Sequence, residues 1–210
     1  MYRLPDSAVA GAGASTPHRR RAGRGCGSAI SLLRLEPGPA GEAAALFGDA
    51  ASGAVLCTDQ AGPNSVQLID VVLGCQGHAA DLLRVERSAS GLVELHMEGT
   101  RLASRAIRVM ADGVHGMARR HGLSVADLAA VVAHGGNGRM PGLLARQLGL
   151  PAERIWSQTA ETGNLGSASL PAAWAMQQPA PRGPVVWTAV GAGLTWAAGL
   201  TGELAMSATL

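Results

Sequence analysis

The stretch AAVVAHGGNGRMPGLLARQLG, residues 129–149, decides the fold class, because it predicts a strand, a polar loop and a helix in that order. Residues 129–134 form an apolar run of the kind found in strands buried on both faces of a sheet. Pro141 suits the first turn of a helix and Gly149 suits its end, with Pro151 just behind it. A buried strand that leads into a helix indicates an α/β layered architecture.

The segments on either side continue this pattern. Apolar residues recur at spacings of three and four over residues 100–122, with arginines on the opposite face, which predicts an amphipathic helix. Ser124, followed by Asp127 three positions later, has the N-cap pattern of a short helix. Further along the chain, the composition predicts a strand, a helix rich in small residues, and two strands joined by a Gly turn, at residues 154–159, 165–176, 184–190 and 193–200.

The N-terminal part of the chain differs in composition and lacks a regular pattern of apolar residues. Residues 1–42 are rich in Gly, Ala, Pro and Arg without a sustained period, which predicts an irregular lead-in. From residue 43 an apolar run, the turn FGDAASG at residues 47–53 and a second apolar run predict two strands joined by a Gly-rich connection. We therefore expect one domain over residues 43–206.

Composition narrows the functional classes. The chain is 47% hydrophobic and 15% charged, so a packed domain is expected, and its 3% aromatic content predicts an aliphatic core with four Trp as the large pieces. A net charge of +2, with all 17 basic residues Arg, is too small to indicate nucleic-acid binding by the whole chain. Cys26, Cys57 and Cys75 form no CxxC pair, so we expect neither a disulfide framework nor a metal site, and a reducing cytoplasm fits. The apolar run at residues 185–200 is shorter than the roughly 20 residues of a membrane span and predicts buried strands.

Three segments place polar residues where a predicted strand meets a turn. They are AHGGNGRMP at residues 133–141 with His134, TGNLGSAS at residues 162–169 with Asn164, and VGAGLTW at residues 190–196. Taken singly, the His is a structural residue at a strand end and the Asn an ordinary turn residue. Strand ends in an α/β fold share one cleft, however, where neutral His and Asn donors and a backbone N–H can hold an oxygen that becomes negative.

These segments, in this order, resemble the His-Gln-Ala-Asn-x-Arg, Gly-Asn-Thr-Ser-Ala-Ala-Ser and Phe-Gly-Gly-Gly-Phe-Thr-Trp motifs of beta-ketoacyl-acyl-carrier-protein synthase III, a family of thiolase-like condensing enzymes. LFGDAASGAVL at residues 46–56 resembles the family's LFGDGAGAVVL turn, and residues 96–107 resemble the start of a family helix. The likeness covers about residues 43–200. It implies an α/β, thiolase-like layered fold, namely the C-terminal half with the last strands of the N-terminal half.

The resemblance also assigns roles. His134 and Asn164 correspond to two members of the family's Cys-His-Asn triad, which hold a malonyl thioester carbonyl while carbon dioxide leaves and an enolate forms. The backbone N–H of Ala192 corresponds to the family's second oxyanion donor, and Arg139 to its contact with the carrier protein. No metal and no cofactor are implied, because the substrates are coenzyme A or acyl-carrier-protein thioesters. A dinucleotide site at residues 191–193 is disfavoured, because Trp196 stands where the third Gly of that fingerprint belongs.

Departures from the family pattern limit what the resemblance implies. Gly135 and Gly136 replace Gln-Ala, Gly138 replaces an apolar residue, and Leu165 and Gly166 replace Thr-Ser, so we expect the walls of the site to be looser or reshaped and leave substrate preference open.

The family's nucleophilic cysteine lies well upstream of the LFGD turn, whereas only 45 residues precede Leu46 in this sequence. Cys26 lies 21 residues before Phe47, too close for the intervening helix and strands, and nothing beside Cys57 or Cys75 would lower a thiol pKa. We therefore expect a chain without its nucleophile.

The resulting expectation is an acyltransferase of fatty acid or polyketide biosynthesis that acts on thioesters. Its expected partners are acyl carrier protein, a coenzyme A thioester, and either further copies of the chain or a missing N-terminal half, with no nucleic acid and no membrane. Two alternatives stay open: a non-catalytic module that binds acyl carrier protein or an acyl thioester, and a truncated product without function.

Overall fold

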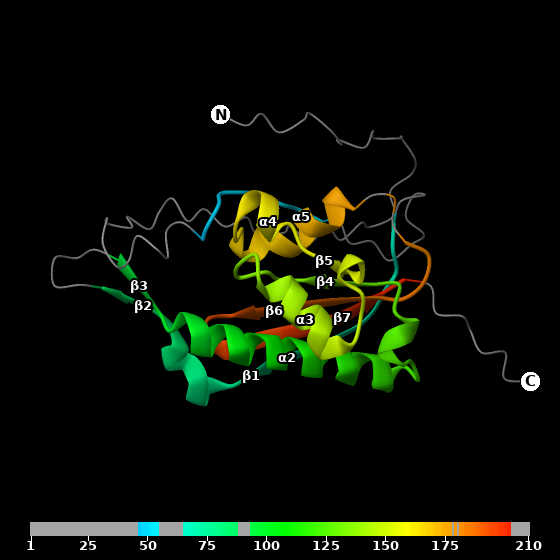
Figure 1. Ribbon diagram of the computed structural model, residues 1–210, viewed down its shortest axis with the longest axis horizontal. Coiled ribbons are helices and arrows are strands. Elements are labelled where there is room, and N and C mark those ends of the chain that lie inside the picture. The colour runs from blue at the N-terminus through cyan, green and yellow to red at the C-terminus, as the bar shows by residue number, and fades with distance from the viewer. Residues whose placement is uncertain (1–45, 55–64, 88–92, 178, 180, 203–210) are drawn as a thin grey trace, which may run out of the picture.

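The computed structural model describes residues 46–54, 65–87, 93–177, 179 and 181–202. A five-stranded sheet lies at its centre, in the order β1-β7-β6-β4-β5, with helices on both faces (Figure 1). Strands β4, β5 and β6 are parallel, whereas β7 runs antiparallel to both β6 and β1. The strands are β1 (Leu68–Cys75), β4 (Ala130–Ala133), β5 (Ile155–Trp156), β6 (Val185–Gly191) and β7 (Thr195–Thr201).

The predicted buried strand is confirmed as β4, all four of whose residues are buried. Val131 and Ala133 point to one face of the sheet, where they pack in the main core with helices α2 (Gly99–Arg120) and α3 (Met140–Leu148). Ala130 and Val132 point to the other face, toward α5 (Ser169–Met176). Because helices cover both faces of β4, its apolar run has no polar alternation.

Helices α2 and α3 confirm the predicted periodicity and end signals. The apolar side of α2 is buried from Ala106 to Ala118, while its arginines lie on the exposed side or at its ends. Gly113 allows α2 to lie close to β7, because a Cβ there would come 3.3 Å from the Cβ of Ala198. In α3, Pro141 lies in the first turn, and Gly149 ends the helix with a left-handed φ of 66°.

The predicted strand at residues 154–159 is wrong beyond its first residues. Strand β5 is only Ile155–Trp156, because Gln158 adopts a helical conformation and the short helix α4 (Thr159–Thr162) follows. The Gln158 side chain is fully buried, and its Nε2 donates to the carbonyl of Gly163, 3.2 Å away. This local hydrogen bond favours the turn over an extended strand.

Other predictions hold in part. The short helix after Ser124 is the 3₁₀ helix η3 (Val125–Asp127), opened by a capping box between Ser124 and Asp127. The helix at residues 165–176 is divided into η5 (Gly166–Ala168) and α5. Neither of the two strands expected around the FGDAASG turn forms within the described residues 46–54, where Phe47 makes an isolated bridge with Asn164 and Ala50 is a second bridge residue. The lead-in at residues 1–42, with Cys26, and the position of Cys57 lie outside the described residues.

The region between residues 65 and 97 holds elements that the sequence patterns did not predict. Strand β1 forms one edge of the sheet, and η2 (Gly77–Leu82) follows it. Strands β2 (Leu83–Arg87) and β3 (Val93–Met97) then pair antiparallel as a separate two-stranded sheet. In Figure 1 this hairpin projects from the N-terminal end of α2.

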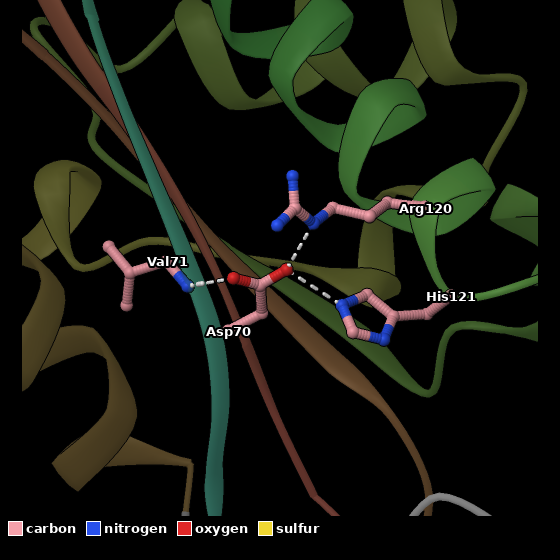
Figure 2. A network of polar contacts seen from close by, with 4 residues as sticks. All are labelled: Asp70, Val71, Arg120 and His121. Atoms are coloured by element: carbon pink, nitrogen blue, oxygen red, sulfur yellow. Dashed lines mark hydrogen bonds and ion pairs between the residues drawn. The ribbon is translucent and has the colours of Figure 1, made fainter.

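A carboxylate ties the edge strand β1 to the C-terminal end of α2 (Figure 2). The Oδ2 atom of Asp70 lies 2.7 Å from Nε of Arg120 and 2.9 Å from Nε2 of His121, and its Oδ1 accepts the N–H of Val71. The hydrogen bond from His121, and then the charge of Arg120, hold the pKa of Asp70 below its ordinary value against partial desolvation.

The apolar run at residues 185–200 forms the β6–β7 hairpin, which confirms the prediction of buried strands. Among the described helices, none is both long and apolar enough to span a membrane. Three of the four Trp pack together on the α5 face, with ring centroids 5.8 Å apart for Trp156 and Trp174 and 5.0 Å apart for Trp174 and Trp187. These Trp side chains provide the large side chains that we expected in an otherwise aliphatic core.

Candidate functional site

The topology brings the three predicted motifs to one edge of the sheet. Strands β6, β4 and β5 are neighbours and parallel, so their C-terminal ends lie at the same edge. His134 follows β4 directly, Ala192 follows β6, and Asn164 follows β5 after the short helix α4. This is the edge at which α/β folds bind ligands.

His134 is held next to β6 and kept neutral. Its backbone N–H donates to the carbonyl of Thr188, 2.9 Å away, which extends the pairing of β4 with β6 by one residue. The side chain is partly accessible at the surface, yet its surroundings desolvate the ring enough to lower its pKa from 6.5 to about 4. A neutral imidazole carries one N–H donor, so at pH 7 this residue is a donor without a charge.

The loop after His134 is shaped by its own polar groups and by α4. The Oγ1 of Thr159 donates to the carbonyl of Gly135, 2.9 Å away. The Oδ1 of Asn137 accepts the N–H of Arg139, which shapes the turn into α3. Arg139 is exposed at the start of that helix, so its guanidinium is accessible to a partner.

The amide of Asn164 has a fixed orientation. Its Oδ1 accepts the N–H of Gly166 at 2.9 Å, so the oxygen end of the side-chain amide faces the backbone of Gly166. No described residue accepts a hydrogen bond from its Nδ2. The side chain is only 9% exposed, so this amino group is a positioned donor at the sheet edge.

The LFGD segment holds Asn164 in place. The backbone N–H of Asn164 donates to the carbonyl of Leu46 at 2.7 Å, and its carbonyl accepts the N–H of Gly48 at 3.0 Å. Gly48 is required by this approach, because a Cβ there would lie 2.2 Å from the carbonyl oxygen of Thr162. A motif far away in the sequence therefore positions a candidate catalytic residue.

Ala192 lies at the exposed tip of the β6–β7 connection, in η6 (Ala192–Leu194). Gly193 takes a left-handed φ of 74° at the centre of this turn. The junction of β1 and η2 anchors the turn: the N–H of Gln76 donates to the carbonyl of Leu194 at 3.1 Å, and Sγ of Cys75 lies 3.4 Å from the carbonyl oxygen of Gly193. Cys75, the free cysteine of the described residues, is thus an exposed strand-end thiol beside the turn.

Sequence reasoning missed the residues that support the site. Thr159, Thr188 and Gln76 hold the loops that carry His134 and Ala192, but each acts on a segment that is remote in the sequence. Thr188 and Gln76 act through backbone groups, so their side chains give no local signal, and Thr159 acts through a hydroxyl at the start of α4, where a Thr is an ordinary residue.

Two hollows, of about 670 and 470 Å³, lie along α2. Neither is lined by His134, Asn164 or Ala192. Arginines of the N-terminal half of α2 line the larger one, and Arg105 among them donates to Oε1 of Gln76 at 2.7 Å. The backbone N–H of the same Gln76 donates to Leu194, so one residue contacts both an arginine of this hollow and the Ala192 turn.

Comparisons with known proteins place most of the described chain beside one family. Residues 118–202 match the family model for the 3-oxoacyl-[acyl-carrier-protein] synthase III C-terminal domain. Beta-ketoacyl-[acyl-carrier-protein] synthase III of Pseudomonas aeruginosa is 39% identical over 163 residues, which are 72% of this chain and 49% of the relative. The Rubrobacter xylanophilus protein of the same name is 30% identical over 157 residues, or 74% of this chain and 49% of the relative.

Solved structures show the same correspondence. The crystal structure of 3-oxoacyl-(acyl carrier protein) synthase III from Pseudomonas aeruginosa superposes with a TM-score of 0.71 at 35% identity, covering 81% of this chain and 54% of that protein. The Aquifex aeolicus structure gives 0.64 at 28% identity, covering 75% and 50%. The chain thus spans about half the length of the relatives it matches.

Proposed function

We propose that this chain, which carries the C-terminal domain of the beta-ketoacyl-[acyl-carrier-protein] synthase III family in a thiolase-like α/β fold, performs the enolate-forming part of that family's acyltransferase chemistry. The supporting observation is the pair His134 and Asn164, two uncharged donors that follow the adjacent parallel strands β4 and β5 at one sheet edge. Decarboxylative condensation or acyl transfer in fatty acid or polyketide biosynthesis is the reaction they fit.

In the proposed mechanism the two donors hold the thioester carbonyl oxygen of a malonyl group. The bond between the α-carbon and the carboxylate breaks, carbon dioxide leaves, and the electron pair moves into an enolate whose oxygen carries the negative charge. The imidazole N–H of His134 and the Nδ2 amino group of Asn164 stabilise this oxygen, since fixed donors act most strongly where charge develops. In the full condensation, the N–H of Ala192 serves the second oxyanion, which forms on the acyl group under attack.

The remaining roles follow the same proposal. Coenzyme A or acyl carrier protein delivers the thioester, no metal or further cofactor takes part, and the reaction takes place in the cytoplasm. The exposed Arg139 contacts the carrier protein. Acyl transfer through a covalent intermediate needs a cysteine, which we assign to a partner polypeptide or a further segment that supplies the other half of the fold around the domain at residues 43–206.

Decarboxylation of a malonyl thioester by the full chain tests the proposal. We expect His134→Ala to abolish the activity and Asn164→Asp to lower it by about 10²–10³, the usual cost of one lost oxyanion donor. Asn164→Asp is informative because a carboxylate keeps the acceptor for the Gly166 N–H while it loses the Nδ2 donor. His96→Ala, at an exposed position on β3, is the matched control.

Equal activity in the wild type and both site variants would overturn the proposal. Thioester binding without decarboxylation would also overturn it and would favour a binding module.

A further inference from the structure

We infer that Thr159 is a positioning residue for His134, and that its hydroxyl takes the space that a side chain at position 135 would need. For catalysis this inference rests on the proposed function, but its geometry stands apart from it. Thr159 is the first residue of α4 and is only 6% exposed. It belongs to none of the motifs that the sequence pattern singled out.

The hydrogen bonds of Thr159 fix the direction of its hydroxyl proton. Its Oγ1 lies 2.9 Å from the carbonyl oxygen of Gly135, and that oxygen can only accept. The single proton of Thr159 is therefore used there, and the hydroxyl of Ser157, 3.0 Å away, must donate to Thr159. The result is a chain of two hydrogen bonds from Ser157 through Thr159 to the loop after β4.

This chain completes the restraint on His134. On one side, the N–H of His134 donates to the carbonyl of Thr188 on β6. On the other side, the carbonyl of the next residue, Gly135, accepts from Thr159 beyond β5. The backbone that carries the imidazole is thus fixed between the strands on both sides of β4.

The hydroxyl of Thr159 leaves no room for a side chain at position 135, so the Thr and the Gly depend on each other. A Cβ on residue 135 would lie 2.2 Å from Oγ1 of Thr159 and 2.7 Å from Oγ of Ser157. The Gly that replaces the Gln of the family motif therefore leaves no empty space in the wall of the site, so of the two expected outcomes the wall is reshaped at this position rather than loosened. Gly135 is buried, and the hydroxyls of Ser157 and Thr159 fill the space of a side chain.

The test compares Thr159→Val, which keeps the shape and removes the hydroxyl, with Thr159→Ser, which keeps the hydroxyl. The first measurement is the pKa of the His134 imidazole by NMR titration of the full chain. We expect Thr159→Val to raise this pKa from about 4 toward 6.5, because the released loop admits water, and Thr159→Ser to leave it unchanged. This measurement needs no activity, so it stands even if the chain decarboxylates nothing and the proposed function fails.

The second measurement is the decarboxylation of a malonyl thioester. Thr159→Val should lower kcat by at least about tenfold with little change in KM, and Thr159→Ser should restore it, because misplacing a donor weakens binding of the transition state more than that of the substrate. A folded Thr159→Val chain with the wild-type His134 pKa and, where the wild type is active, the wild-type kcat would overturn the inference.

A double-mutant cycle keeps the inference testable if Thr159→Val does not fold. Gly135→Ala alone should shift the unfolding midpoint strongly downward, whereas the same change made on a Thr159→Ala background should shift it much less, because the closest clashing atom is gone. Additive shifts would show that the two residues do not share the space, and would overturn the coupling.

Discussion

His134 combines a surface position with an environment that disfavours its charge. Its pKa of about 4, against 6.5 in an unfolded chain, means that the folded state binds fewer protons than the unfolded state between these values. A protonated His134 would stabilise an enolate more strongly, but with this pKa it would lose its proton at neutral pH. The neutral ring instead provides a donor whose state does not change between pH 5 and 8.

This depressed pKa predicts a pH dependence of stability. The free energy of unfolding should decrease as pH falls from 6.5 to about 4, because the unfolded state gains the proton first, and His134 should contribute no further change below that. The loss is on the order of 3 kcal/mol. Denaturant unfolding across pH 4–7 measures it, with His134→Gln as the comparison; an equal slope in that variant would show that other groups cause the decrease.

At the scale of elements, the network around Asp70 joins the sheet edge to α2 (Figure 2). Among the described strands β1 pairs with β7 alone, so side chains such as this carboxylate add a second restraint. Its C-terminal end leads to Cys75 and Gln76, which anchor the Ala192 turn. Greater mobility of β1 would therefore displace the turn that carries the candidate oxyanion donor, the N–H of Ala192.

Asp70→Ala should increase hydrogen–deuterium exchange across residues 71–75 at pH 7. Because the pKa of Asp70 is lowered in the folded state, its contribution is present above the ordinary value of 3.8 and is lost as pH falls through the folded value. Asp112→Ala removes the same charge from an exposed position on α2 and should leave β1 unchanged. Equal exchange in the two variants would show that the network does not hold the strand.

The elements also show how far the sequence could predict the structure. Helices α2 and α3 follow from local periodicity and end residues, and the order of β4, β6 and β7 follows from apolar runs. The end of β5 did not follow from the pattern of apolar residues, because a hydrogen bond from the buried side chain of Gln158 to the carbonyl of Gly163 favours a turn there. The candidate residues His134 and Ala192 could be found at strand ends and Asn164 by its motif, whereas their supports could not, because Thr159 and Leu46 act on neighbours in space.

At the scale of the whole molecule, the two faces of the sheet are covered unequally. Helices α2 and α3 cover one face, and α5 with its Trp cluster covers β4 and β6 on the other. Strand β1 instead exposes large aliphatic side chains, with Leu73 75% and Val71 49% accessible. Soluble proteins seldom leave such neighbouring apolar residues open unless another surface covers them. The relatives have about twice the matched length, so they include further chain that could cover such a face.

We therefore expect the chain to self-associate when it is studied alone. Sedimentation velocity should show a weight-average mass that rises with concentration, because burial of Leu73 and its neighbours removes apolar surface from water. Leu73→Ser should weaken this association, whereas Leu143→Ser, at an exposed position on α3, should not. Association should also weaken when the polypeptide that supplies the other half is added, since both would compete for β1. A wild-type chain that stays monomeric at every concentration would show that the β1 face needs no cover.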